Sequence, residues 1–272
     1  MPDRDPRRLV FVAGLHRSGT TPLARALARH PDISGLVGTG VKEDEGQHLQ
    51  QVYQRARAFG GAGRFALQPG AHLTERSPLV TAQNCERLWA AWEPYWDLRC
   101  RLLVEKSPPN LVMSRFLQAL FPGSALVVVV RHPVVVALST RKWRKAASRR
   151  WLNHASLEAM VEHWLYAHSL LLNDLPLLQR IHILRYEDLV TQPRQTLQGV
   201  QRLLDLKTSI PDQGLQPRSG DYEAAWEAMR EGGVRQRRSR RRVESRFGAA
   251  VETFGYRLDD LQFRANWSVP LR

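Results

Sequence analysis

The sequence predicts an α/β protein with an open, doubly wound, mostly parallel sheet flanked by helices. Short runs of Val, Ile and Leu without alternation are typical of strands that are buried on both faces, as parallel strands are. Helical patterns separate these runs, and such alternation predicts right-handed crossovers between parallel strands. The 272 residues allow a substantial core, and we expect one domain over residues 8–268 after a short tail, residues 1–7.

The elements follow from local patterns along the chain. Strands are expected at the apolar runs 9–14, 101–105, 125–130 and 181–186. Helices are expected at 19–29, 44–58, 79–97, 110–120, 133–146, 155–178, 193–205 and 236–254. Segments 59–78 and 206–220 are rich in Gly and Pro without a period, so we expect loops there, the first as a mobile cover over a site.

A phosphate-binding loop is predicted directly after the first strand, in "GLHRSGTTPLARAL". Gly14 permits a tight turn, and Gly19 lets the backbone approach a ligand closely. Hydroxyl donors follow at Ser18, Thr20 and Thr21. The first-turn N–H groups of the following helix favour an anion. The spacing G-x-x-x-x-G-x-T matches a Walker A loop except at its lysine, while Arg17 adds a positive charge inside the loop. The alternative is a capped turn without a ligand.

Two other predicted strands also end at basic residues. Arg131 stands where a nucleoside triphosphatase would need an aspartate for magnesium, and a cation there can instead bind a second phosphate. Ser139 lies eight residues beyond Arg131, in the helix that Pro133 starts. Lys106 follows the strand 101–105 and could stabilise negative charge on a bridging oxygen. The alternatives are a surface lysine and an arginine at a strand end. Together these residues predict a ligand with at least two anionic groups, bound without metal.

These segments resemble motifs of the sulfotransferases that use 3′-phosphoadenosine 5′-phosphosulfate (PAPS). "HRSGTT" resembles their 5′-phosphosulfate loop, and "RHPVVVALS" resembles their 3′-phosphate motif. "EKSP" is similar to a lysine-bearing segment of the tyrosylprotein and bacterial branches. "LRYEDLV" resembles the later tyrosine-acidic segment, and "EDEGQHLQ" resembles a bacterial subgroup. The resemblance covers about residues 9–190.

The resemblance implies a P-loop NTPase-like sulfotransferase fold and a role for each matching residue. The implied 5′-phosphosulfate site comprises Arg17, Ser18, Gly19, Thr20 and Thr21, with Arg17 also catalytic. Arg131 and Ser139 would hold the 3′-phosphate, and Lys106 would assist the leaving oxygen. Tyr186 would line the adenosine pocket or simply pack. Two departures stand out: arginine replaces the loop lysine of many cytosolic members, and the late R-K-G-x-x-G-x-x-K segment has only a loose analogue in "REGGVRQRRSRRR".

The implied reaction is a metal-independent, in-line transfer of a sulfuryl group from PAPS to an acceptor hydroxyl or amine. A base is expected among Glu43, Asp44, Glu45 and His48. Helical spacing would place Glu45 and His48 on one face, and adjacent carboxylates would raise one another's pKa, so Glu45 is favoured ahead of Glu43 and His48. The alternative is that these acidic residues have no catalytic role and lie at the start of a helix, where they complement its dipole.

Charge, composition and missing motif residues weigh against other classes of protein function. The net charge of +14 favours anionic partners or reflects an arginine-rich surface. A P-loop nucleotide kinase or NTPase lacks its lysine and its magnesium carboxylate here. A nucleic-acid-binding protein is disfavoured because the basic run 235–242, expected on a C-terminal helix, has no interleaved aromatics. Two cysteines and no run long enough for a membrane span suggest a reduced, cytoplasmic protein. The acceptor stays open, and a homodimer is compatible with the sequence.

Overall fold

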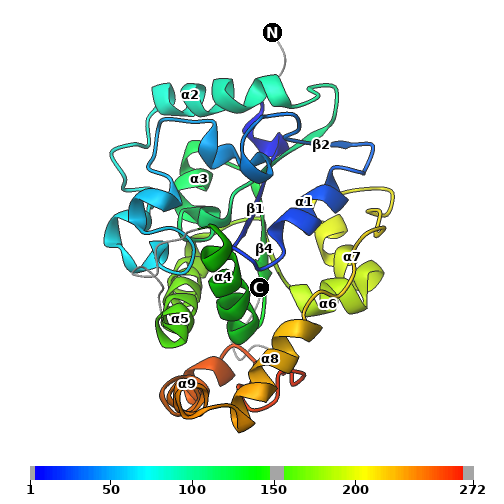
Figure 1. Ribbon diagram of the computed structural model, residues 1–272. Coiled ribbons are helices and arrows are strands. Elements are labelled where there is room, and N and C mark those ends of the chain that lie inside the picture. Colours follow the sequence, from blue (N-terminus) through cyan, green and yellow to red (C-terminus); the bar gives the residue numbers. More distant parts are fainter. Residues whose placement is uncertain (1–3, 148–155, 266–272) are drawn as a thin grey trace.

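The computed structural model describes residues 4–147 and 156–265, and within them the core is a five-stranded parallel sheet (Figure 1). Its strands are β1 (Leu9–Gly14), β2 (Ile33–Gly35), β3 (Leu102–Lys106), β4 (Ala125–Val130) and β5 (Ile181–Arg185). Their order in the sheet is β2-β3-β1-β4-β5. The predicted α/β class and its four strands are therefore confirmed. Strand β2 was not predicted, because three residues are too short to give a pattern.

Helices cover both faces of the sheet (Figure 1). They are α1 (Thr20–Leu27), α2 (Ala82–Trp92), α3 (Ser114–Leu120), α4 (Pro133–Ala147), α5 (Leu157–Asp174), α6 (Tyr186–Thr191), α7 (Pro193–Leu203), α8 (Gly220–Glu231) and α9 (Val234–Glu252). Leu9 and Phe11 of β1 pack into a core with α2 to α5, whereas Val10 and Val12 pack into a second core with α1, α6 and α7. Two buried faces explain the unbroken apolar runs of the strands.

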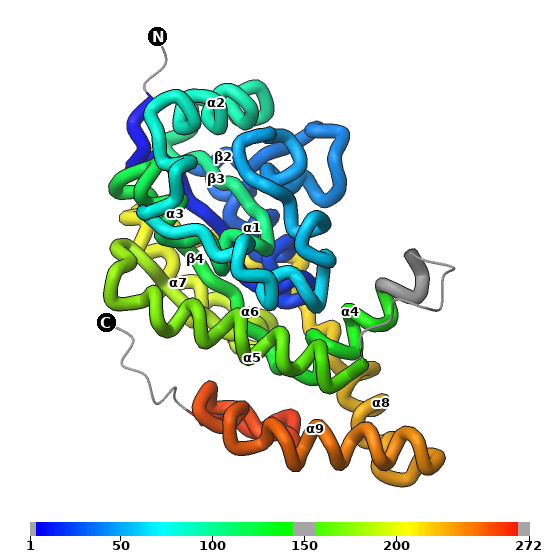
Figure 2. The backbone as a smooth tube through the Cα atoms, turned by 90° about the vertical axis from the view of Figure 1, so that its left-hand side faces the viewer, coloured from blue at the N-terminus to red at the C-terminus, as the bar shows by residue number. Residues whose placement is uncertain are grey.

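The last two helices form a layer outside the sheet. Helix α9 packs along α5 and against α8, and Figure 2 shows it running beside α5. The basic run 235–242 lies on α9, so its prediction as part of a helix is confirmed. Helix α8 was not predicted, although it buries Trp226 and Met229; it begins at Gly220, the last residue of the expected loop 206–220.

The helix expected at 44–58 is wrong. Short 3-10 turns replace it, at Lys42–Asp44, Gly46–His48 and Ala56–Phe59. Glu43 and Asp44 have positive φ values of 55° and 49°, which an α-helix cannot accommodate. The buried Gln50 side chain accepts from the backbone N–H of Val52 and Tyr53 at 2.6 and 2.9 Å, and so takes the place of helical hydrogen bonds.

The remaining predicted helices are present with shifted bounds. Pro94 begins a 3-10 turn, Glu93–Tyr95, after α2, and a 3-10 segment, Pro108–Val112, precedes α3. Segment 59–78 contains two further turns, Phe65–Leu67 and Pro69–Ala71, and its mobility stays a prediction. Residue 155 of one predicted helix, residues 1–3 of the tail and the domain end at 268 lie outside the described residues.

Sheet order brings the predicted loops together. β1 lies between β3 and β4, so the loops after these three strands meet at the carboxyl edge of the sheet. Register pairs Val12 with Lys106 and Gly14 with Val129. Strands β3 and β2 lie on one side of β1, and strands β4 and β5 lie on the other. Ligands of doubly wound sheets bind at such a switch point.

Candidate active site at the carboxyl edge of the sheet

The loop after β1 adopts backbone angles that require glycine at two positions. Gly14 and Gly19 have φ values of 151° and 104°. A Cβ on Gly14 would lie 2.5 Å from the carbonyl oxygen of Val129, and one on Gly19 would lie 2.3 Å from the ring of Tyr186. Arg17 also has a positive φ of 73°, which is uncommon for a residue with a side chain. Such strain clusters at functional loops, because the surrounding packing must hold it.

Several polar atoms around this loop are buried without a hydrogen-bond partner among the described residues. They are Ser18 Oγ, Arg131 Nε and His16 Nδ1. No side chain caps the N-terminus of α1, where Thr20 begins the helix. A buried donor without a partner is costly, so this concentration marks a place where an anion would supply the missing acceptors.

The second predicted arginine meets the loop directly. Arg131 is 6% exposed and donates to the Arg17 carbonyl oxygen at 2.9 Å, and to Ser219 Oγ at 2.8 Å. Its guanidinium stacks on the ring of Tyr186 at 4.1 Å. Arg17 in turn donates from Nε to Ser139 Oγ at 3.0 Å. The two arginines and Ser139, separated in sequence, therefore lie together.

Arg131 is a buried cation, and the nearby acidic groups of Tyr186 and Glu187 only partly offset the effect of burial on its pKa. No ion pair joins it to a carboxylate in the described part of the chain, although many surface arginines have one. Burial lowers the pKa of its guanidinium. Since an unpaired buried charge is expensive, this position favours an anionic ligand.

Lys106 and Glu45 form a buried ion pair beside the loop. Lys106 Nζ lies 3.2 Å from Glu45 Oε1, and the two side chains are 5% and 9% exposed. Glu45 Oε2 accepts from Gln47 Nε2 at 2.6 Å and lies 3.5 Å from His48 Nε2. Burial raises the pKa of Glu45, but the hydrogen bond with His48 and the charge of Lys106 outweigh it and bring the pKa to about 2.

The expected cluster of three adjacent carboxylates is wrong. Glu43 faces Arg25 at 3.9 Å, and Asp44 accepts from the backbone N–H and the hydroxyl of Thr39 at 3.1 and 2.6 Å. Glu45 therefore has cationic rather than anionic neighbours, and its pKa is lowered instead of raised. Glu45 and His48 do come together, through a 3-10 turn rather than an α-helix.

Two titratable residues of this region were missed from the sequence. His16, inside the motif "HRSGTT", is held by burial at a pKa of about 4 and packs edge-on against Phe65. Glu105 is fully buried and accepts from Ser107 Oγ and Asn110 Nδ2, both at 2.6 Å. Burial raises the pKa of Glu105 to about 7. The position of Glu105 next to Lys106 at the end of a strand was the available signal for it.

The loops enclose a cavity of about 1810 Å³. The predicted residues that line it are Arg17, Gly19, Thr20, Thr21, Glu43, Glu45, His48, Arg131 and Ser139. Lys106 is not among the lining residues, but it pairs with Glu45, which lines the cavity. Gly60, Gly61 and Ala62 of the predicted cover also line it. Binding pockets for one small ligand usually measure roughly 300–1,000 Å³, so this cavity has room for two.

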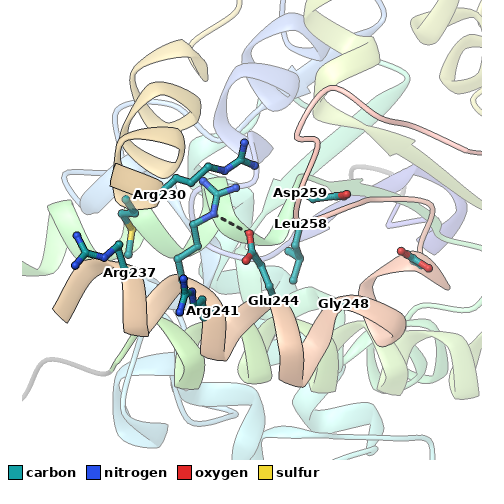
Figure 3. A pocket seen from close by; sticks show the side chains of 10 residues that line it. Arg230, Arg237, Arg241, Glu244, Gly248, Leu258 and Asp259 are labelled. Carbon is teal, nitrogen blue, oxygen red and sulfur yellow. Dashed lines mark hydrogen bonds and ion pairs between the residues drawn. The ribbon is translucent and has the colours of Figure 1, made fainter. Parts of the chain in front are cut away.

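A second cavity of about 400 Å³ lies between α8 and α9 (Figure 3). Arg230, Arg237 and Arg241 line it, and Arg240 donates to Glu244, one turn further along α9, at 2.7 Å. Within the described residues, the basic run 235–242 contributes no side chain to the main cavity. The run therefore belongs to a separate surface from the predicted site.

Two further searches cover the same described residues. None of their helices is long and apolar enough to cross a membrane. They also hold no group of three or more His, Cys, Asp or Glu side chains that could bind a metal ion.

This chain is similar to several known proteins. The nodulation protein NoeE of Sinorhizobium fredii (strain NBRC 101917 / NGR234) is 28% identical over 143 residues, which cover 51% of this chain and 32% of that protein. The match thus spans about a third of the length of this relative. The sulfotransferase domain from the curacin biosynthetic pathway is 22% identical, with a TM-score of 0.45 over 84% of this chain and 81% of that one. A sulfotransferase from Alicyclobacillus acidocaldarius is 14% identical, with a TM-score of 0.49 over 87% and 94%.

The family match rests on the part of the chain that builds the main cavity. The sequence model described as "Sulfotransferase family" matches residues 9–210, which include all five strands and the loops that follow them. This match covers most of the chain, and the chain therefore belongs to the sulfotransferase family.

Proposed function

We propose that this protein transfers a sulfuryl group from PAPS to an acceptor hydroxyl or amine, by in-line displacement without a metal. The observation that carries the proposal is the buried guanidinium of Arg131, which forms no ion pair with a carboxylate of residues 4–147 and 156–265 and contacts the phosphate-type loop after β1. Family membership supports sulfuryl transfer, and the two joined arginine loops support a donor with two anionic groups.

The residues present fit such a donor. Ser18 Oγ and Arg131 Nε are buried without partners, and both donate hydrogen bonds that phosphate or sulfate oxygens accept. We assign the 5′-phosphosulfate to the loop from Arg17 to Thr21 and the 3′-phosphate to Arg131 and Ser139. Tyr186 both lines the cavity and stacks on Arg131, so one ring serves packing and ligand contact. When bound, PAPS supplies the sulfuryl group and leaves as 3′-phosphoadenosine 5′-phosphate (PAP).

Lys106 and Glu45 have complementary roles in this proposal. Lys106 would donate to the bridging oxygen that takes up negative charge, as a preorganised donor does in a low-dielectric site. This donation would draw the ammonium away from Glu45, from which it lies 3.2 Å in the structure. Loss of the cation raises the pKa of Glu45 from about 2 toward the range of a useful base. Glu45 would then accept the acceptor's proton, with His48 as the other candidate at 3.5 Å.

The test is calorimetric titration with PAP in the absence of metal. Wild-type protein should bind PAP, and Arg17→Ala and Arg131→Ala should each weaken binding about 100-fold, because removal of one partner of a buried charge pair costs roughly 2–5 kcal/mol. Arg76→Ala is the matched control, since this side chain is 90% exposed. Unchanged affinity in Arg131→Ala would contradict the proposal. Binding that requires magnesium and prefers ATP would favour a nucleotide kinase instead.

A further inference from the structure

The wall of the main cavity beyond Glu45 is built on a well-anchored segment. Gln47 is 1% exposed, donates from Nε2 to Glu45 Oε2 at 2.6 Å, and accepts at Oε1 from the backbone N–H of Ala56 at 3.1 Å. One buried side chain therefore joins the carboxylate of Glu45 to the backbone between Arg55 and Arg57. The position of these two arginines relative to Glu45 is thereby fixed.

The segment between these points is also held from inside. Gln50, 2% exposed, donates to the Tyr53 carbonyl oxygen at 3.0 Å, besides accepting from Val52 and Tyr53. Val52, Tyr53 and Ala56 pack into the core that faces α2 to α5. The backbone that carries Arg55 and Arg57 is therefore held in place by buried hydrogen bonds and core packing.

Arg55 and Arg57 carry uncompensated charge into the cavity. Both line it together with Glu45 and His48, and both are exposed. Neither guanidinium has an ion pair or a hydrogen bond among residues 4–147 and 156–265. The nearest acids along the chain are already engaged, since Glu45 pairs with Lys106 and Glu43 faces Arg25.

These arginines come from a different segment of the chain than the groups assigned to the co-substrate. Arg17 and Arg131 stand on the loops after β1 and β4, and Arg131 stacks on Tyr186 beside α6. Ala56, between Arg55 and Arg57, packs on the opposite face of the sheet, toward α4 and α5. Gln47 joins Glu45 to the backbone of Ala56, so Arg55 and Arg57 belong to the segment that carries the candidate base.

We infer that the acceptor carries an anionic group, a carboxylate, sulfate or phosphate, which Arg55 and Arg57 bind while its hydroxyl or amine faces Glu45. This inference rests on the proposed function and adds the chemical class of its second substrate. Each guanidinium group can donate two hydrogen bonds to the oxygens of such an anion, which a neutral acceptor does not offer. The general positive charge of the protein would also draw anionic acceptors toward the cavity.

The test compares matched probes on protein saturated with PAP. Ligand-observed NMR titration measures the affinities of para-nitrophenyl β-glucuronide against para-nitrophenyl β-glucoside, and of glucose phosphate against glucose. Wild-type protein should bind at least one anionic probe about 10-fold or more tightly than its neutral counterpart. The first pair reports on a carboxylate and the second on a phosphate. The variant Arg55→Gln/Arg57→Gln should lose the preference, while Arg76→Gln, on an exposed side chain outside the cavity, should keep it.

Each outcome separates this inference from the proposed function. Equal binding of anionic and neutral probes to wild-type protein overturns the inference, as does a preference that survives Arg55→Gln/Arg57→Gln. Unchanged PAP affinity in the double variant shows that the arginines do not belong to the co-substrate site, and a 10-fold loss of PAP affinity there would assign them to it and overturn the inference. Failure of wild-type protein to bind PAP contradicts the proposed function, independently of the probes.

Discussion

The buried carboxyl of Glu105 should make the stability of this protein fall as pH rises. The side chain is fully buried in β3, and its pKa is about 7 instead of 4.5, chiefly because of burial. We propose the substitution Glu105→Gln, which keeps the shape but cannot ionise. Asn110 Oδ1 is buried without a partner, so a flip of that amide can accept from the new Nε2 group.

The sign and the size follow from the two pKa values. Between about pH 4.5 and pH 7 the unfolded chain loses the Glu105 proton while the folded chain keeps it, so the folded state binds more protons and stability decreases with rising pH. A shift of about 2.5 pKa units corresponds to roughly 3 kcal/mol of destabilisation above pH 7, and about 2.5 kcal/mol of this develops between about pH 5 and pH 8. In Glu105→Gln this pH-dependent contribution to the free energy of unfolding is absent.

Urea unfolding of both proteins at several pH values measures the effect. The stability of Glu105→Gln relative to wild type should rise by about 2.5 kcal/mol from about pH 5 to pH 8. Other titrating groups are shared by the two proteins and cancel in the difference, as does any constant effect of the amide on packing. A difference that stays flat across this range would refute the reasoning that burial dominates at Glu105.

Two further predictions concern the cavity. Gly19→Ala should cost about 1–2 kcal/mol of stability from its positive φ and about 1–3 kcal/mol more from contact with Tyr186, and should weaken PAP binding. Gly38→Ala, with a φ of 67° and open space around its Cβ, is the control for thermal unfolding and should show the first cost alone. Lys106→Gln should lower kcat and raise the pKa of Glu45 in the free enzyme, because a cation at 3.2 Å is removed. The acidic limb of the pH dependence of kcat/KM, which reports the free enzyme, would then move to higher pH, and an unmoved limb would exclude Glu45 as the base.

The sheet and the arginine loops were predictable because their signals are local. An apolar run buried on both faces has a distinct composition, and the residue after it lies at the carboxyl edge whatever the strand order. Arg17, Lys106 and Arg131 were placed at that edge on this ground alone. Their mutual contacts needed the strand order, with β1 between β3 and β4, which no local pattern reveals.

The segment around Glu45 was mispredicted for a different reason. Its polar and apolar spacing is compatible with a helix, but Glu43 and Asp44 adopt left-handed backbone angles. The pKa of Glu45 is lowered by the hydrogen bond with His48 and by the charge of Lys106, which is 61 residues away in sequence. Neither the turn nor the ion pair leaves a mark within a short window, so the direction predicted for the pKa of Glu45 was wrong, and its role as the base stays a prediction.

The contacts between the two arginine loops have a consequence for ligand choice. Arg131 donates to the carbonyl oxygen of Arg17, and Arg17 donates to Ser139, so each loop is attached to the other at 2.9 and 3.0 Å. If the two loops bind anions as proposed, the separation between the two anionic groups is set by the protein and not by the ligand. A nucleotide with one anionic end, or with two ends at another separation, would leave a buried donor without an acceptor. Discrimination among nucleotides would then arise from the spacing of their phosphates, even where the base itself is held loosely.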